Sequence, residues 1–164
     1  AALNPKVKFI ASFYPALSDL DGFLNGRAGG WPQYFRGKET INKDKFMTTI
    51  PYYDVVNFAR RLNVPGFYSY GYNDETCSPT SVTATINEIS APKIVEVTPT
   101  SGHWRYISTN DNSIEWMKTK YIGLVDTCVK RVDDGLDCSG CPFENSCDDF
   151  IREVVGVDAS LFDR

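Results

Sequence analysis

Hydrophobic and polar positions follow two different periods along most of this chain. Short runs rich in β-branched and aromatic residues predict buried strands, and the stretches between them place apolar residues three or four positions apart, which is typical of amphipathic helices. The predicted strands lie at residues 7–14, 65–72 and 93–98. The predicted helices lie at residues 51–62, 78–89 and 112–125.

Each predicted helix has a start signal of its own. Pro51 fits the first turn of a helix, where its missing N–H costs nothing. Ser78 stands before Pro79 as an N-cap, and Asn112 and Glu115 have the spacing of a capping box. The alternation of strands and helices predicts an α/β fold with a parallel sheet.

Three strands make only a partial sheet. We expect that residues preceding Ala1 once supplied neighbouring strands, because the chain begins almost directly on a core strand. An uncovered apolar sheet edge favours pairing with another chain, so we expect self-association, that is a homo-oligomer, if the chain stands alone.

Composition limits the classes of partner. The chain has 164 residues, of which 42% are hydrophobic and 13% aromatic, values typical of a globular domain. The net charge is −4 and no basic stripe is present, so we expect no nucleic-acid partner. No apolar run approaches the roughly 20 residues that span a bilayer, so we expect no membrane partner.

The C-terminal part has a different texture, with acidic residues and four cysteines, so we place a domain at residues 1–127 and a Cys-rich acidic tail at residues 128–164. Two disulfides in an exported protein are one explanation, and unpaired thiols are another. A zinc ion or an iron–sulfur cluster is a third, although the uneven spacing fits no standard zinc ribbon. The four candidate ligands are Cys128, Cys138, Cys141 and Cys147.

Two polar residues at predicted strand ends carry the candidate chemistry. Asp74 closes the second strand segment, and His103, the single histidine of the chain, follows the third. Carboxyl ends of parallel strands converge on one crevice, so the two side chains can meet there. His103 would act as a general base toward a serine, and Asp74 would orient it. Two unrelated surface-loop residues are the alternative.

The order Asp…His is the second half of the Ser…Asp…His order of α/β-hydrolases, but no G-x-S-x-G motif occurs in the sequence. Ser12 and Ser101 do not stand on a strand-to-helix turn, so we treat them as ordinary serines. Cys77 is a poor replacement nucleophile, because lone cysteines are usually inert small hydrophobes.

Aromatic residues in loops are candidate substrate contacts. The loop over residues 16–40 is rich in glycine and contains Trp31 and Tyr34, and Trp104 directly follows His103. These side chains could stack on a sugar or cover an acyl pocket. Plain packing beneath a long loop is the other explanation, and we favour it for the loop aromatics.

Three segments resemble one known family in the same order. Gly71-Tyr72-Asn73-Asp74-Glu75-Thr76-Cys77-Ser78-Pro79-Thr80-Ser81 resembles the acid segment of the acetyl xylan esterase / cephalosporin C deacetylase family of carbohydrate esterases. Residues 53–61 resemble the helix that precedes it in that family, and residues 26–35 resemble a loop of bacterial members. The resemblance covers roughly residues 1–122. It departs at Ser78, where the family commonly has a first proline, and at Trp104, where it often has an acidic residue or Gln.

The resemblance implies the C-terminal part of an α/β-hydrolase fold that removes acetyl groups from xylan-derived oligosaccharides or small acetyl esters. Asp74 would be the acid and His103 the base of a Ser-His-Asp triad, and no cofactor is implied. The family's nucleophile segment would precede Ala1. We therefore expect this chain to be inactive by itself.

Two other functions remain open from the residues alone. The partial fold could be a non-catalytic module that binds a carbohydrate or a protein, or the cysteines of the tail could define a metal-cluster module. The sequence does not decide the location, although the cysteine-rich tail favours a periplasmic or secreted protein over a cytoplasmic one.

Overall fold

The computed structural model describes residues 1–38, 42–104 and 106–134. The chain divides into two units, Ala1–Lys118 and Thr119–Arg164. Cys138, Cys141 and Cys147 lie outside the described residues, as does the side chain of Cys128, so the chemistry of the tail and the boundary near residue 127 stay predictions. Among the described helices, none combines the length and the apolar character needed to cross a bilayer.

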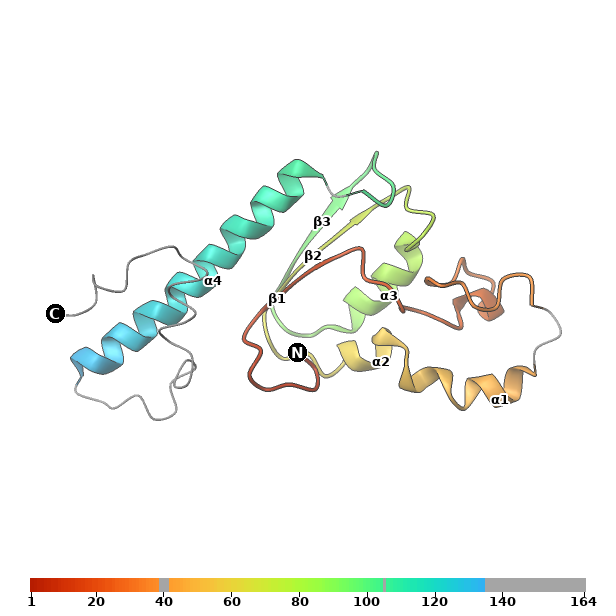
Figure 1. The fold of residues 1–164 in the computed structure, drawn as a ribbon, viewed down its shortest axis with the longest axis horizontal. Helices are drawn as coiled ribbons and strands as arrows, with labels where there is room; N and C mark the ends of the chain where they lie inside the picture. Colours follow the sequence, from red (N-terminus) through yellow and green to blue (C-terminus); the bar gives the residue numbers. More distant parts are fainter. Residues whose placement is uncertain (39–41, 105, 135–164) are drawn as a thin grey trace. The chain divides into compact units, whose positions relative to one another are not determined.

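The first unit is built on a three-stranded parallel sheet in the order β1-β2-β3 (Figure 1). The strands are β1 (Ile10–Phe13), β2 (Gly66–Gly71) and β3 (Lys93–Thr98). Their flanking helices complete the α/β architecture, as the alternating pattern predicted. The third strand has its predicted bounds, whereas the first is shorter than residues 7–14.

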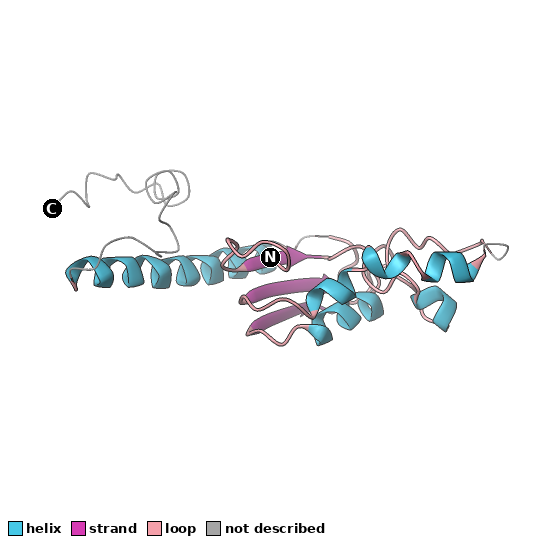
Figure 2. Ribbon diagram, turned by 90° about the horizontal axis from the view of Figure 1, so that it is seen from below, coloured by secondary structure: helices cyan, strands magenta, loops and turns pink. Residues whose placement is uncertain are grey.

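Helices α2 (Val55–Ala59) and α3 (Pro79–Glu88) cover one face of the sheet (Figure 2). Tyr68 of β2 packs there against Val82 and Ile86, which lie one helical turn apart and form the apolar stripe of α3. Burying that stripe holds α3 on the sheet and fixes where the loop between β2 and α3 begins.

The N-terminal part of α4 (Ile107–Asp133) covers the opposite face. Phe67 neighbours Tyr68 in β2, so its side chain points to the other side of the sheet, where its ring lies 6.0 Å from that of Trp116. Glu96 of β3 adds a polar contact, because it accepts a 2.7 Å hydrogen bond from the hydroxyl of Thr109. The central strand β2 is therefore covered on both faces, whereas Ile94, Val95 and Val97 of the edge strand β3 remain exposed.

The predicted start of the last helix is wrong. The helix begins at Ile107, so Asn112 lies inside it and caps nothing. The side-chain amide of Asn112 instead donates a 3.1 Å hydrogen bond to the carboxylate of Glu96. The side chain of Asn112, which the sequence pattern assigned to a helix cap, thus makes a tertiary contact with β3.

The predicted helix at residues 51–62 is also wrong, because Asp54 interrupts it. A short 3₁₀ turn, η2 (Ile50–Tyr52), ends before Asp54, and α2 begins after it. Asp54 has an extended backbone (ψ 120°), and its carboxylate accepts a 2.9 Å hydrogen bond from the N–H of Val56. Asp54 is thus an N-cap and not an interior helical residue.

Ser78 precedes α3 as predicted, but it does not cap the helix through its side chain. Its hydroxyl donates a 3.3 Å hydrogen bond to the carbonyl oxygen of Gly29, in the long loop. That loop includes a 3₁₀ turn, η1 (Gly22–Asn25), and the helix α1 (Lys43–Met47) follows it. Neither element was predicted, because both are too short to show a period.

Candidate active site

Asp74 and His103 follow the carboxyl ends of neighbouring parallel strands. β2 ends at Gly71 and β3 at Thr98, and the loops after them carry the two residues. His103 Nδ1 and Asp74 Oδ2 are 2.8 Å apart, so the two side chains are hydrogen-bonded. The sequence argument predicted this meeting from the strand ends alone.

The carboxylate of Asp74 is held at both oxygens. Its side chain is completely buried, and Oδ1 accepts hydrogen bonds of 2.8 Å from the backbone N–H groups of Thr76 and Cys77. These donors leave Oδ2 to face the imidazole. With Oδ2 accepting, Nδ1 of a neutral His103 carries the proton and Nε2 is the acceptor nitrogen.

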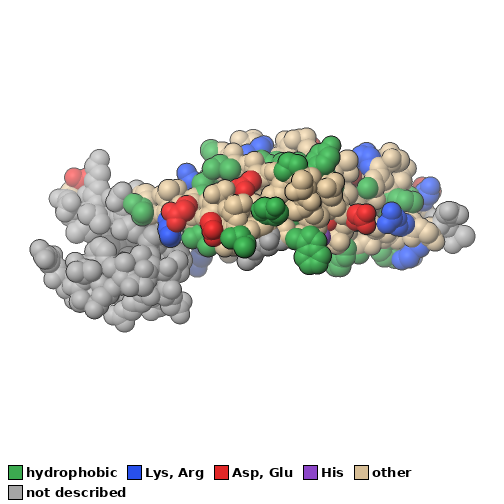
Figure 3. All heavy atoms as spheres, turned by 90° about the horizontal axis from the view of Figure 1, so that it is seen from above, with side chains coloured by type: hydrophobic (Ala, Val, Ile, Leu, Met, Phe, Trp, Pro, Cys, Tyr) green, Lys and Arg blue, Asp and Glu red, His purple; other side chains and the backbone are tan. Residues whose placement is uncertain are grey.

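His103 reaches the surface although its partner does not. Its side chain is 44% exposed, and the purple atoms of the histidine are visible next to hydrophobic side chains in Figure 3. A buried acid behind an accessible imidazole is the arrangement that a proton-transferring histidine requires.

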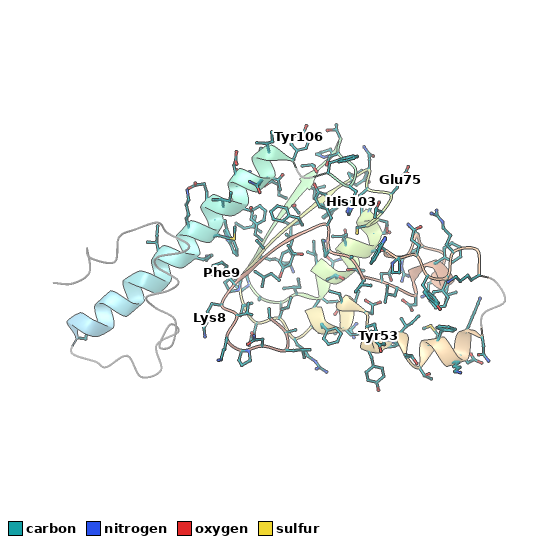
Figure 4. The ribbon with its side chains drawn as sticks, viewed as in Figure 1. Lys8, Phe9, Tyr53, Glu75, His103 and Tyr106 are labelled. Atoms are coloured by element: carbon teal, nitrogen blue, oxygen red, sulfur yellow. The ribbon has the colours of Figure 1, made fainter. Side chains whose placement is uncertain are left out.

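Asn73 joins the two loops directly. Its backbone N–H donates a 3.0 Å hydrogen bond to the carbonyl oxygen of Ser101, and its side-chain amide donates a 3.2 Å bond to that of Pro99. Figure 4 labels His103 and Glu75 at this end of the sheet, one in each loop. The contacts of Asn73 therefore hold the two loops together, and the spacing between Asp74 and His103 does not depend on their own hydrogen bond alone.

Gly71 lets the two loops approach this closely. A Cβ atom at Gly71 would overlap the carbonyl oxygens of Ser101 and Gly102. We expect Gly71→Ala to lower the free energy of unfolding by about 2 to 3 kcal/mol, since the backbone of the histidine loop must move away. Urea denaturation measures this.

The matched control is Gly123→Ala, because a Cβ placed on this helical glycine meets no atom of the described residues within 4 Å beyond the backbone of its own helix. Alanine is the better helix former there, so the control should be neutral or more stable by up to about 1 kcal/mol. Equal stability of the Gly71→Ala protein and the unmodified chain would contradict the close-approach argument.

Tyr14 is a site residue that the sequence analysis missed. It directly follows β1, its N–H donates a 2.9 Å hydrogen bond to the carbonyl oxygen of Ser69, and its ring centroid lies 5.1 Å from that of His103. It also has a φ of +50°, which is uncommon for a residue other than glycine. Its position just past a strand end, like those of Asp74 and His103, was the signal available in the sequence.

Cys77 follows Asp74 in the same loop and is buried. Burial, and secondly the charge of Asp74, raise the pKa of its thiol to about 11, so it stays protonated near neutral pH. The thiolate is the nucleophilic form of cysteine, so this supports the expectation that Cys77 does not replace a serine nucleophile.

The predicted substrate-contact residues lie in two loops. Trp104 is 75% exposed beside His103, and Trp31 is also exposed. The ring of Tyr34 packs edge-on against that of Phe35, with 5.5 Å between the ring centroids, and Lys38 Nζ lies 4.0 Å from the centroid of the Tyr34 ring. These contacts cover part of the Tyr34 ring. Their role in substrate binding stays a prediction.

The loop that carries Trp31 is anchored to the acid loop. Gln33 Nε2 donates a 3.0 Å hydrogen bond to the carbonyl oxygen of Glu75. Asp54 holds the other end, accepting hydrogen bonds of 3.1 and 2.8 Å from the N–H groups of Asp19 and Leu20. The long loop is therefore fixed at both ends.

Comparison with known proteins decides the family. The family model described as acetyl xylan esterase (AXE1) matches residues 1–120. The chain belongs to the acetyl xylan esterase family. The chain is also similar to the acetyl esterase Axe7A of Xylanibacter ruminicola, with 43% identity over 118 residues, which are 72% of this chain and 27% of Axe7A.

Solved structures agree on the fold. Acetyl xylan esterase 1 from Thermoanaerobacterium sp. JW/SL YS485 matches 73% of this chain and 40% of its own with a TM-score of 0.64 and 28% identity. Acetyl xylan esterase from Paenibacillus sp. R4 matches with the same coverage and TM-score at 22% identity, which supports the fold alone. The chain spans about a quarter of the length of Axe7A and two fifths of these two structures. The family resemblance predicted from Gly71–Ser81 is confirmed, as is the partial α/β-hydrolase fold.

Proposed function

We propose that this chain supplies the acid and the base of a carboxyl-ester hydrolase that removes acetyl groups from xylan-type oligosaccharides. One observation carries the proposal: the 2.8 Å hydrogen bond between buried Asp74 and accessible His103 at the carboxyl ends of adjacent strands. Membership of the acetyl xylan esterase family supports the substrate class.

The reaction follows from the protonation states of the pair. His103 Nε2 takes the hydroxyl proton of a serine as that oxygen attacks the acetyl carbonyl carbon, and then returns it to the sugar oxygen that leaves. Water, deprotonated by the same nitrogen, then attacks the carbonyl carbon of the acetyl-serine. The bond between that carbon and the serine oxygen breaks, acetate leaves, and His103 Nε2 returns the proton to the serine oxygen. Asp74 holds the Nδ1–H tautomer throughout and stabilises the imidazolium. No cofactor takes part in these steps.

The serine and the oxyanion donors come from outside the 164 residues in this proposal, because the sequence has no G-x-S-x-G motif. The chain by itself is accordingly inactive. Trp104 and Trp31 offer exposed aromatic faces, on which a sugar ring can stack. Tyr34 contributes less, since its ring already packs against Phe35. An exported homo-oligomer remains a prediction that rests on the sequence alone.

A chimaera tests the proposal. The 118 matched residues of Axe7A are replaced by their counterparts from this chain, so that the rest of Axe7A supplies what the chain does not cover. We expect the chimaera to hydrolyse p-nitrophenyl acetate and acetylated xylo-oligosaccharides, and the isolated chain to hydrolyse neither.

Two outcomes would count against the proposal. A folded chimaera without activity favours a non-catalytic module that binds carbohydrate or protein, and pull-down on acetylated xylan then distinguishes these two. Hydrolysis by the isolated chain that persists in the His103→Ala variant would show that other residues carry the chemistry.

A further inference from the structure

Three different metal-ligating groups meet at the buried side of the Asp74–His103 pair. The Cys77 sulfur, a carboxylate oxygen of Asp74 and a ring nitrogen of His103 all lie within 4.8 Å of one another. Thiolate sulfur, imidazole nitrogen and carboxylate oxygen are the protein ligands of zinc, and metals that prefer sulfur use the same set. The triad chemistry uses only two of these groups.

We propose that Asp74, Cys77 and His103 form a binding site for a thiophilic divalent cation of the Zn²⁺ class. Zinc–ligand bonds of about 2.0 to 2.3 Å in a tetrahedron put ligand atoms roughly 3.3 to 3.8 Å apart. The three groups therefore need to shift by only about an ångström. The exposed edge of His103 gives the cation an entry path and leaves room for water as the fourth ligand.

The surroundings hold the ligands in place before any cation arrives. Asp74 Oδ1 is fixed by the N–H groups of Thr76 and Cys77, which directs Oδ2 toward the imidazole and keeps Cys77 next to the carboxylate. Such outer contacts around a metal ligand typically contribute tenfold to a hundredfold in affinity. A loop that had to order itself would lack this advantage.

Binding redistributes two protons. The Cys77 thiol loses its proton to solvent as the sulfur–metal bond forms. Without the cation, the Nδ1–H of His103 donates to Asp74 Oδ2. The cation can therefore bind Nδ1 only when the neutral imidazole carries its proton on Nε2 instead. One proton leaves the protein, and the histidine keeps one.

The same change turns His103 from a base into a donor. An Nε2–H group cannot accept the hydroxyl proton of a serine, so a bound cation would stop the ester hydrolysis. This consequence rests on the proposed function, whereas binding of the cation does not.

Cadmium is the probe, because a cadmium–thiolate bond gives an ultraviolet charge-transfer band. The full chain is used with its four other cysteines replaced by serine, so that only one thiol remains; these are Cys128, Cys138, Cys141 and Cys147. We expect one Cd²⁺ per chain, with the band rising to saturation, and displacement by Zn²⁺ in a calorimetric titration.

The variants locate the site. Cys77→Ser and Cys77→Ala should abolish the band and weaken calorimetric binding by about 10-fold to 100-fold or more, since the outer contacts around a metal ligand already contribute that much. His103→Ala should weaken binding by about 10-fold or more while the band remains at high Cd²⁺. Glu75→Gln removes an exposed charge of the same loop and is the matched control, which should bind within about twofold of the parent.

Circular dichroism first establishes that each variant is folded, and two replacements of Cys77 guard against a variant that is not. The proposal is overturned if the parent shows no saturable band, or if folded Cys77→Ser binds Cd²⁺ as tightly as the parent. A cadmium site in the chain together with an inactive chimaera would overturn the proposed ester hydrolysis and leave the cation site standing.

Discussion

Asp74→Asn is expected to lower kcat of the active chimaera by about 10³- to 10⁴-fold with little change in KM. The asparagine oxygen can still accept from the N–H groups of Thr76 and Cys77, so the loop keeps its shape. Its amide nitrogen then replaces Oδ2 and faces His103. A donor in that place forces the imidazole proton onto Nε2, and the base is lost although the geometry is kept.

Steady-state kinetics on p-nitrophenyl acetate measures the effect, and Glu75→Gln serves as the control for loss of a carboxylate from the same loop. The Asp74→Asn and His103→Ala double variant should be no slower than the slower single variant, because residues that act as one unit are not additive. A loss below tenfold for Asp74→Asn would show that Asp74 does not orient the base.

Asp54→Ala is expected to lower the free energy of unfolding by about 3 to 5 kcal/mol, a large part of the roughly 5 to 15 kcal/mol of an ordinary domain. Asp54 is buried, and its carboxylate accepts hydrogen bonds from three backbone N–H groups, those of Asp19, Leu20 and Val56. Alanine leaves these donors without the carboxylate, and the first turn of α2 without its cap.

Urea denaturation measures this loss, and Asn42→Ala is the matched control. Asn42 is an exposed N-cap of α1 whose side chain accepts a hydrogen bond from the N–H of Lys45, so its loss should cost about 0.5 to 1 kcal/mol. Asp54→Asn keeps one acceptor oxygen, so its loss of unfolding free energy should lie between those of Asp54→Ala and Asn42→Ala. Equal effects at Asp54 and Asn42 would mean that the buried bonds add nothing beyond capping.

Asp74 and Asp54 also show where sequence patterns succeed and where they fail. Asp74 and His103 could be paired from the sequence, because each follows a strand and parallel strands end at one edge. Asp54 was placed inside a helix, because apolar spacing around it continues through Leu62. Its real partners, Asp19 and Leu20, are far away in sequence, and no local period reports on them.

The position of Cys77 was equally hidden. From the sequence, Cys77 was expected to be an ordinary small hydrophobic residue. Its exposed fraction of 3% confirms that it is buried. That this thiol also lies beside the imidazole of His103 depends on the loop after β3 folding back over the loop after β2. Asn73 and the absence of a side chain at Gly71 allow that fold, and both act through contacts with residues in the other loop.

The sequence by itself determined the three strands, the parallel α/β fold, the esterase family and the meeting of Asp74 with His103, because these follow from local periodicity, from strand ends and from ordered motifs. Tertiary structure alone decided where helices begin, which polar groups serve as caps, and which third side chain joins Asp74 and His103. The sequence pattern predicted that Asn112 and Ser78 cap helices. In the folded chain the side chain of Asn112 instead bonds to Glu96, and that of Ser78 bonds to Gly29. A polar group takes the partner that folding brings within reach, and long-range contacts set that partner.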